Sequence, residues 1–367
     1  MGTNPLIALT ALGQSLWYDY ITRDLIASGR LAALIADDGL RGMTSNPTIF
    51  EKAISGSEDY DADIRRLAAL GRAPQEIFES LAVDDVRSAC EAFAQVHRAT
   101  GGADGLVSIE VNPELAHDTE GTISEARRLW AAVARPNAMI KIPATKAGIP
   151  AIEECLAEGI SINITLLFAV ERYEEVIEAF LRGLERRTAA GQPIEAVNSV
   201  ASFFVSRVDG RVDPELDKKG DPQRLRGTIA IANAGMAYAA FERSRATPRW
   251  KALAAAGARP QRPLWASTST KDPKYPDTHY VEALIAPETV NTIPPDTLEA
   301  YRDHGKPAVR IHEAMAGAPR RLRELSAQGI DLTEVTRFLE NDGVAKFAAS
   351  YKQLLTGIDA KAAALVK

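Results

Sequence analysis

Short apolar runs alternate along the chain with longer segments whose apolar residues recur every three or four positions. The short runs have the length of β-strands, and they cover residues 15–21, 41–46, 105–111, 138–144, 160–168, 196–205, 263–269 and 288–294. The segments between them, such as ISEARRLWAAV and ERYEEVIEAFLRGLERRTAAG, have the period of amphipathic helices. Strands that alternate with helices predict an α/β protein with a parallel sheet.

Eight strands, each followed by a helix, predict a closed (β/α)8 TIM barrel. The alternative is an open doubly wound sheet, which normally carries a glycine-rich phosphate loop after its first strand. The segment after Tyr18, DYITRDLIASG, contains no such loop. We therefore expect the barrel.

The spacing of the runs predicts additions to the barrel. A polar insertion, LDKKGDPQRLRG, occupies residues 216–227 and precedes a helix expected near 228–247. The tail beyond residue 310 has the pattern of two or three extra helices, with a break expected at ENDG, residues 340–343. We expect a single barrel domain over residues 1–367, with a C-terminal helical extension at about 310–367.

Composition and charge narrow the class of protein. Hydrophobic residues make up 46% of the chain and charged residues 25%, which is enough apolar material for a large core and excludes wholesale disorder. The net charge of −6 does not favour binding to nucleic acid, although it allows a local basic pocket for one phosphate. The sequence does not indicate an oligomeric state.

No membrane, secretory or metal signal stands out in the sequence. The longest apolar runs fall short of the ~20 residues that a membrane span needs, and the N-terminal segment lacks the basic start of a signal peptide. Cys90 and Cys155 are expected to be buried free thiols, and the five histidines show no ligand spacing. We expect a cytoplasmic protein without a metal or another cofactor.

Polar residues stand at the ends of many predicted strands, where an ordinary core would have Val, Ile or Leu. In an α/β barrel these carboxyl ends form the mouth that holds the reactive groups. The residues in question are Asp19, Asn46, Glu110, Lys141, Asn163, Thr165, Ser202, Arg207 and Ser267 to Lys271.

Lys141 lies in AMIKIPAT, among apolar residues of a strand that should be buried. Lysine is almost never fully buried without a reason. Burial disfavours the ammonium form, and the neutral amine is a nucleophile that forms a Schiff base with a ketone. The alternative is a lysine that extends to the barrel mouth or pairs with a carboxylate. Asp19 and Glu110 at the same mouth favour the nucleophile.

These two carboxylates suit proton transfer around an imine, one taking a hydroxyl proton and the other working through water. The alternative is that one of them only forms an ion pair with Lys141. Neutral hydrogen-bonding groups at the same mouth suit a polyol, although such residues often belong to turns and helix caps, and TSNP has the composition of a turn. They are Asn46, Asn163, Thr165 and Ser202.

A phosphate site is predicted beside the sixth and seventh strands. Arg207 follows SFFVS, and its guanidinium can bind a phosphate through two hydrogen bonds. The alternative is an arginine on a helix surface. The segment STSTKDP adds hydroxyls and Lys271 on the next strand.

Five segments, in this order, resemble signatures of the transaldolase family in its longer bacterial branch. They are GMTSNPTIF (42–50), MIKIPAT (139–145), SINITLLF, SFFVSRVD and the stretch from WASTSTKDP to ETVNTIPPDTL. The resemblance runs from about residue 4 to the C-terminal helices. It implies a barrel of the class I aldolase type that acts in the non-oxidative pentose phosphate pathway.

The implied reaction moves a dihydroxyacetone unit from sedoheptulose 7-phosphate to glyceraldehyde 3-phosphate, giving erythrose 4-phosphate and fructose 6-phosphate. By this resemblance Lys141 forms the imine and Asp19 takes the proton of the C4 hydroxyl. Glu110 works with a bound water that Thr165 helps to hold. Asn46, Asn163 and Ser202 bind the three-carbon fragment, and Arg207 binds the phosphate.

The sequence departs from the family pattern after the seventh strand. Shorter relatives have a second phosphate-binding arginine there, whereas ASTSTK leaves this role to Lys271 with Ser267 or Ser269. Phe204 stands in a pair of phenylalanines, at a site where aldolase-type relatives have a tyrosine. The missing hydroxyl favours transfer over the first alternative, a fructose 6-phosphate aldolase-type lyase. The second alternative, a barrel that only binds sugar phosphates, has no need of a buried amine, so Lys141, Asp19 and Glu110 together argue against it.

Overall fold

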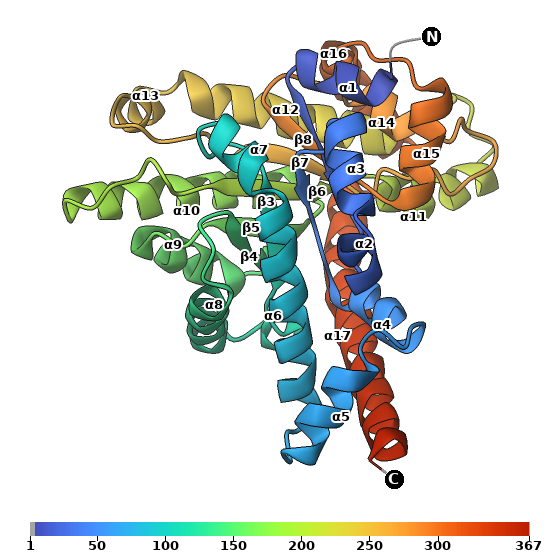
Figure 1. Cartoon of the computed structure of the whole chain (residues 1–367). Coiled ribbons are helices and arrows are strands. Elements are labelled where there is room, and N and C mark those ends of the chain that lie inside the picture. The colour runs from blue at the N-terminus through green and yellow to red at the C-terminus, as the bar shows by residue number, and fades with distance from the viewer. Residues whose placement is uncertain (1–3, 367) are drawn as a thin grey trace.

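Eight parallel strands form a closed barrel at the centre of the computed structural model, which describes residues 4–366 (Figure 1). The strands follow one another around the barrel in sequence order, and β1 pairs with β8 to close it. Their bounds are β1 Gln14–Tyr18, β2 Gly42–Met43, β3 Leu106–Glu110, β4 Ala138–Pro143, β5 Ile162–Leu167, β6 Ser199–Phe204, β7 Arg262–Ala266 and β8 Thr289–Ile293. The predicted TIM barrel and its eight strands are confirmed.

Helices surround the strands, so nearly every strand residue is buried. The helices that precede the C-terminal extension are α1 Pro5–Ala11, α2 Arg23–Ala27, α3 Arg30–Asp37, α4 Pro47–Ser55, α5 Asp61–Ala69, α6 Pro74–Ala92, α7 Ala94–Ala99, the short 3₁₀ helix η1 Pro113–Leu115, α8 Thr119–Val133, α9 Gly148–Glu158, α10 Val170–Ala189, α11 Ser206–Lys218, α12 Ile229–Ala246, α13 Pro248–Ala255, α14 His279–Ala283 and α15 Pro295–His304. The helix expected near 228–247 is therefore confirmed as α12.

The barrel interior depends on one glycine in the shortest strand. Gly42 of β2 lies against the indole of Trp17 of β1, and a Cβ at this position would come within 2.7 Å of the ring. Because Trp17 is fully buried, the ring has no room to move away. Glycine is therefore the residue that allows β1 and β2 to pair here.

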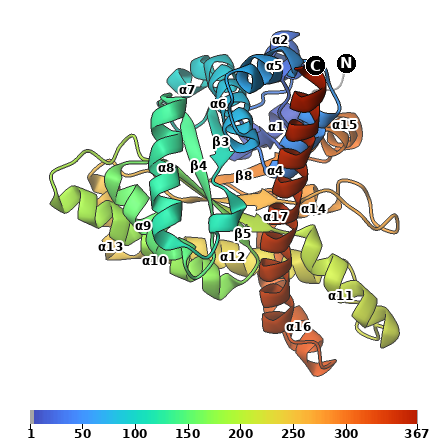
Figure 2. The ribbon, with the colours of Figure 1, turned by 90° about the horizontal axis from the view of Figure 1, so that it is seen from below.

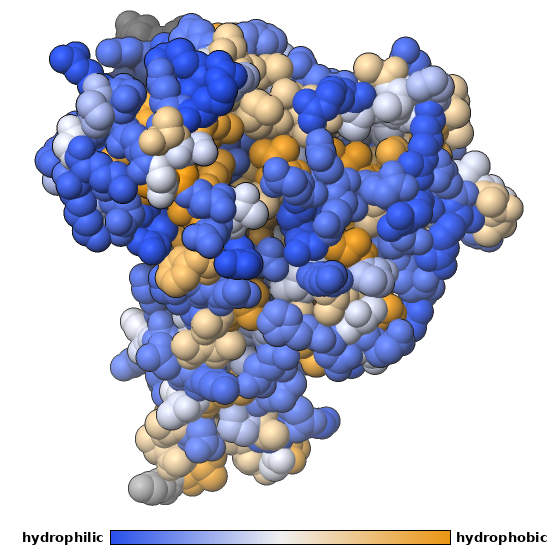
Figure 3. All heavy atoms as spheres, turned by 180° about the vertical axis from the view of Figure 1, so that it is seen from behind, coloured by the Kyte–Doolittle hydropathy of each residue, from blue (hydrophilic) through white to orange (hydrophobic). Residues whose placement is uncertain are grey.

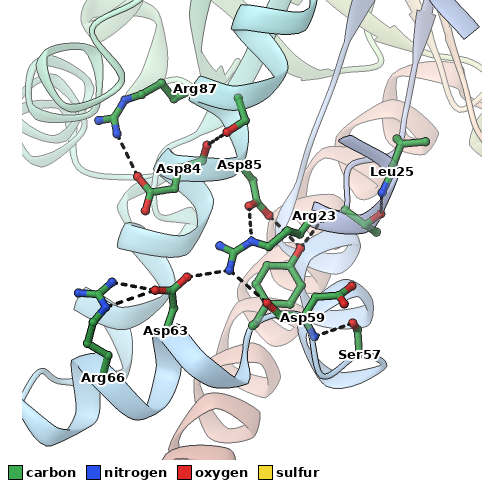
Figure 4. A network of polar contacts seen from close by, with 12 residues as sticks. Arg23, Leu25, Ser57, Asp59, Asp63, Arg66, Asp84, Asp85 and Arg87 are labelled. Atoms are coloured by element: carbon green, nitrogen blue, oxygen red, sulfur yellow. Dashed lines mark hydrogen bonds and ion pairs between the residues drawn. The ribbon is translucent and has the colours of Figure 1, made fainter. Parts of the chain in front are cut away.

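The long segment between β2 and β3 forms helices α4 to α7, and a partly buried polar network joins two of them, α5 and α6, to the start of α2 (Figure 4). Arg23 at the start of α2 pairs with Asp63 of α5 at 2.8 Å and with Asp85 of α6 at 3.2 Å. The Tyr60 hydroxyl donates a hydrogen bond to Asp85 at 2.8 Å and accepts one from the backbone N–H of Arg23. This network fixes the orientation of α5 and α6 relative to α2.

Two extra helices complete the chain, as expected for the tail beyond residue 310. They are α16, Ile311–Ala327, and α17, Leu332–Leu365. α17 packs against α4, α5 and α6, and all four extend together away from the barrel (Figure 1). Seen from below, α17 runs in front of the barrel strands (Figure 2), and it also contacts α11 and β5.

The break expected at residues 340–343 is wrong, because α17 continues through this segment. Gly343 serves the packing of the helix and does not end it. A Cβ at Gly343 would lie 2.9 Å from Cδ2 of Leu166, at the end of β5. From the sequence alone, a glycine that permits such a close approach cannot be distinguished from one that ends a helix.

The surface of the protein is mostly hydrophilic in the view from behind, with apolar residues in small groups (Figure 3). Cys90 and Cys155 are both buried and unpaired with one another, as expected. Within residues 4–366, none of the helices combines the length and the apolar character that crossing a bilayer requires.

Candidate functional site

A cavity of about 1140 Å³ opens at the carboxyl ends of the barrel strands. Among the predicted site residues, those that line it are Asp19, Asn46, Lys141, Thr165, Ser202, Phe204, Arg207, Ser267, Ser269 and Lys271. Glu110 and Asn163 are not on its lining, and each contacts one of these residues from behind. The structure thus brings the predicted residues together at one end of the barrel.

Lys141 comes from the middle of β4, and only 4% of it is exposed. Its Nζ atom lies 3.1 Å from Oε2 of Glu110 and donates a hydrogen bond to the backbone oxygen of Ser45 at 3.2 Å. The ring of Phe347, on α17, faces the same atom with its centroid at 5.6 Å. Lys141 therefore does not extend into solvent, and the ion pair with a carboxylate is present.

Glu110 is the direct neighbour of Lys141, because the two residues pair across β3 and β4. Its side chain is 5% exposed. Burial raises the pKa of Glu110 above its ordinary range, and the positive charge of Lys141 opposes this effect. A carboxyl group in this position is close enough to the lysine nitrogen to exchange a proton with it.

Asp19 follows β1 directly, and the Thr44 hydroxyl donates a hydrogen bond of 2.6 Å to its Oδ1 atom. Thr44 is itself held by Thr292, at 2.7 Å between the hydroxyl oxygens. Burial raises the pKa of Asp19, while Lys141 and the Thr44 hydrogen bond act in the opposite direction. Perturbed carboxyl groups beside a buried amine are typical of a catalytic site.

Asn163, Ser202 and Ser108 form a hydrogen-bonded chain next to Lys141. The Ser202 hydroxyl donates to Oδ1 of Asn163 at 2.7 Å, and Nδ2 of Asn163 donates to the Ser108 hydroxyl at 2.9 Å. All three residues are buried. Asn163 thus orients the hydroxyl of Ser202, and Ser202 is one of the residues that line the cavity.

Thr165 and Asn46 lie on the lining in different hydrogen-bonding states. The Thr165 hydroxyl is buried and has no hydrogen-bond partner within residues 4–366, so it can accept one from a bound molecule. Asn46 caps helix α4, because its Oδ1 atom accepts a hydrogen bond from the backbone N–H of Ile49 at 3.0 Å. Asn46 therefore occupies a helix-cap position, which is the alternative expected for it, and it also lines the cavity.

Arg207 lies at the start of α11, with its guanidinium over the ring of Phe204 at 5.1 Å. Burial lowers the pKa of Arg207, and the charges of Asp342 and Asp19 act against this effect. Its Nη1 atom is buried and makes no hydrogen bond in the described part of the chain. An arginine with an unused donor on a cavity wall suits an anion.

The loop after β7 forms the neighbouring wall. Ser267 has a left-handed backbone, with φ of 55°, and its hydroxyl lies 3.1 Å from that of Ser206. Lys271 is exposed at the cavity edge. Tyr275 connects this loop to α11, because its hydroxyl donates to Asp213 at 2.8 Å.

Sequence reasoning missed several residues of the site. Thr44 and Ser45 stand beside Asn46 in the motif GMTSNPTIF, so their position is the available signal. Asp209 is buried on α11, accepts hydrogen bonds from the Ala230 N–H and the Tyr280 hydroxyl, and has its pKa raised by burial to about 7. No spacing pattern pointed to it. The sequence pattern indicates only that Phe347 is an ordinary core residue of a C-terminal helix.

Metal-binding geometry is not found at this site. Across residues 4–366, no group of three or more His, Cys, Asp or Glu side chains is placed to hold a metal ion. The groups present are an amine and two carboxyl groups, which support nucleophilic and acid–base chemistry, next to side chains that suit an anion.

The comparison with protein families gives one match over nearly the whole chain. Residues 16–358 match the model of a family described as transaldolase/fructose-6-phosphate aldolase. This range contains most of β1, all of β2 to β8, the residues of the cavity and most of α17.

Similar proteins named transaldolase match over almost their full length. The relative from Acidothermus cellulolyticus is 54% identical over 360 residues, which is 97% of this chain and 96% of that protein. A relative from Parafrankia is 52% identical over 359 residues, which is 97% of each chain. The one from Thermobifida fusca is 49% identical over 366 residues, covering 98% of this chain and 99% of the relative.

Proposed function

The chain belongs to the transaldolase/fructose-6-phosphate aldolase family, and from that premise we propose that Lys141 carries its chemistry as the amine that forms an imine with a ketose phosphate. The protein is a transferase of aldehyde and ketone residues. Its reaction moves a dihydroxyacetone unit from sedoheptulose 7-phosphate to glyceraldehyde 3-phosphate, giving erythrose 4-phosphate and fructose 6-phosphate.

The observation that supports Lys141 most directly is its contact with Glu110 in a buried setting. Transfer of one proton from the ammonium to Glu110 leaves a neutral amine, which adds to the ketone carbonyl. Burial favours the neutral form of Glu110. The same carboxyl group then donates its proton to the hydroxyl that leaves as water when the carbinolamine becomes an iminium ion.

Asp19 is the base that begins cleavage in this proposal. Its carboxylate takes the proton of the C4 hydroxyl, the C3–C4 bond breaks, and the electron pair moves into the iminium ion to give an enamine. The first aldehyde leaves while the three-carbon unit stays bound to Lys141. The enamine carbon then attacks the second aldehyde, and Asp19 returns its proton to the new alkoxide.

The remaining lining residues bind the two ends of the substrate. Ser202, oriented by Asn163, and Asn46 hold the hydroxyls of the three-carbon unit, and Thr165 holds the water that Glu110 uses. A second set of residues holds the phosphate at the far end of the substrate. It consists of Arg207 and Lys271 with the hydroxyls of Ser267 and Ser269.

Phe204 favours transfer over simple lysis. Its ring lines the cavity and lies 5.3 Å from that of Phe168, so this part of the wall offers no hydroxyl to protonate the enamine. We therefore rank the transferase above the lyase. The same proposal places the protein in the cytoplasm, where its two unpaired, buried cysteines suit a reducing compartment.

Borohydride reduction in the presence of fructose 6-phosphate tests the proposal. We expect a reduced three-carbon adduct on the peptide that contains Lys141, detected by mass spectrometry after digestion. The variant Lys141→Met is the control and should remain unmodified. An adduct on another lysine, or no adduct on the unchanged protein, would contradict the assignment.

Replacement of Arg207 tests the phosphate subsite. We expect Arg207→Gln to raise KM for phosphorylated substrates by about 10- to 100-fold, because a hydrogen bond to a charged group contributes roughly 1.5–3 kcal/mol. Arg211→Gln is the matched control, since Arg211 lies one turn further along α11 and pairs with Glu215 at 3.4 Å. Equal KM changes in the two variants would rule out a specific role for Arg207.

A further inference from the structure

Helix α17 reaches the proposed catalytic lysine from outside the barrel. It places Phe347 on the cavity wall, with 5% of the residue exposed and its ring centroid 5.6 Å from Nζ of Lys141. Figure 2 shows the helix passing in front of the strands that carry the site. A C-terminal addition to the barrel therefore contributes directly to the surroundings of the reacting nitrogen.

Within residues 4–366, the direct contacts of this nitrogen include two polar groups and one aromatic ring. The Glu110 carboxylate lies at 3.1 Å, the Ser45 carbonyl oxygen at 3.2 Å and the face of Phe347 beyond them. The carboxylate can exchange a proton with the nitrogen and the carbonyl oxygen accepts a hydrogen bond from it, whereas the ring does neither. An aromatic face within about 6 Å also stabilises a cation, including an iminium ion.

We propose that Phe347 is a specificity-determining residue that shields the enamine on Lys141 from water, so that the three-carbon unit passes to an aldehyde. This inference rests on the proposed function. The competing reaction begins when the enamine carbon takes a proton from water and becomes an iminium ion. Water then adds, the C–N bond breaks, and the products are free dihydroxyacetone and the regenerated amine. Exclusion of water slows both steps.

The position of the ring is fixed on both sides along α17. One turn before it, Gly343 lies so close to Leu166 that a Cβ would come within 2.9 Å of that side chain. Three residues after it, the Ser350 hydroxyl accepts a hydrogen bond from Thr48 of α4 at 2.8 Å. An ion pair between Lys361 and Asp61, at 2.7 Å, holds the far part of the helix. These contacts explain why a helix outside the barrel can place one ring accurately.

Phe347 and Phe204 act at different places. Phe204 of β6 lies under Arg207, whereas Phe347 of α17 faces the lysine nitrogen. The two rings come from separate elements on the wall of the same cavity, so replacing one leaves the other in place.

The test compares Phe347→Ala and Phe347→Leu with Phe338→Ala. Phe338 lies on the same helix, is 51% exposed and lies against Arg211 at the rim. Each protein is incubated with fructose 6-phosphate, with and without erythrose 4-phosphate, and the release of free dihydroxyacetone is compared with the rate of transfer. We expect this ratio to rise roughly tenfold in Phe347→Ala and less in Phe347→Leu. We expect no change in Phe338→Ala.

Two readouts separate this inference from the proposed function. Borohydride trapping on Lys141 in the unchanged protein tests the imine, and its absence would overturn the proposed function. If the adduct forms but the ratio stays unchanged in both Phe347 variants, the role of Phe347 is wrong. A merely structural role would lower both rates together, leave the ratio constant and equally contradict the inference. If Phe347→Ala does not fold, Phe347→Leu decides.

Discussion

Lys141→Met is expected to lower kcat by at least about 10⁴-fold, the order of effect seen when a covalent nucleophile is removed. Methionine has a similar length and remains compatible with a buried strand position, but it has no amine to capture the ketone carbonyl. The loss should appear in kcat with either phosphorylated donor. Steady-state assays of transfer from fructose 6-phosphate to erythrose 4-phosphate measure it.

The same variant should still fold, although it leaves Glu110 without its partner. Removal of one member of a buried ion pair is costly when the other stays charged. Because burial already raises the pKa of Glu110, this carboxyl group can take up a proton and remain neutral. The double variant Lys141→Met/Glu110→Gln is the control, and its thermal unfolding should lie close to that of the single variant. Turnover above one hundredth of the unchanged rate in Lys141→Met would exclude the imine mechanism.

The barrel could be predicted because its strands are buried on both faces and therefore appear as short apolar runs. Each run is separated from the next by an amphipathic helix, and eight such units give the number of strands that closes a barrel. β2 is the exception in length, since it is reduced to Gly42–Met43. The run over residues 41–46 still predicts a strand at this place.

The candidate site could be predicted in part for a related reason. Residues at the carboxyl ends of the strands meet at one mouth, so the sequence order alone groups Asp19, Lys141, Thr165 and Ser202. Whether Glu110 pairs with Lys141 or moves protons could not be separated from the sequence. The structure shows that the pair exists, and the short distance is what makes proton exchange between the two groups possible.

The contribution of α17 could not be predicted, because it depends on long-range packing. Phe347 and Gly343 are far in sequence from β4 and β5, and an apolar residue on a helix gives no sign of which surface it covers. In the sequence this glycine predicts a helix end, since close approach and termination use the same residue type. Only the path of the helix across the barrel mouth distinguishes the two cases.

Asp19→Asn is expected to lower the rate of cleavage by about 10²- to 10⁴-fold, the usual effect of losing a general base. The imine should still form, because Asp19 is not needed until the C4 hydroxyl loses its proton. Borohydride should therefore trap an adduct on Lys141 in this variant, and most of it should be the uncleaved six-carbon sugar. Rapid-quench measurement of aldehyde release separates cleavage from imine formation.

The pH profile and the stability of Asp19→Asn provide independent checks. Burial raises the pKa of Asp19 above its ordinary value of 3.8, and the group must be ionised to act as a base, so activity of the unchanged protein should fall as the pH drops through this raised pKa. A buried carboxyl with a raised pKa makes the folded state less stable as the pH rises from the ordinary value to the raised one, because the folded state holds the proton more tightly than the unfolded state. Asparagine removes this cost and keeps an oxygen for the Thr44 hydroxyl. We therefore expect a higher Tm at neutral pH together with slower cleavage, whereas a lower Tm with unchanged cleavage would show that Asp19 is a structural residue.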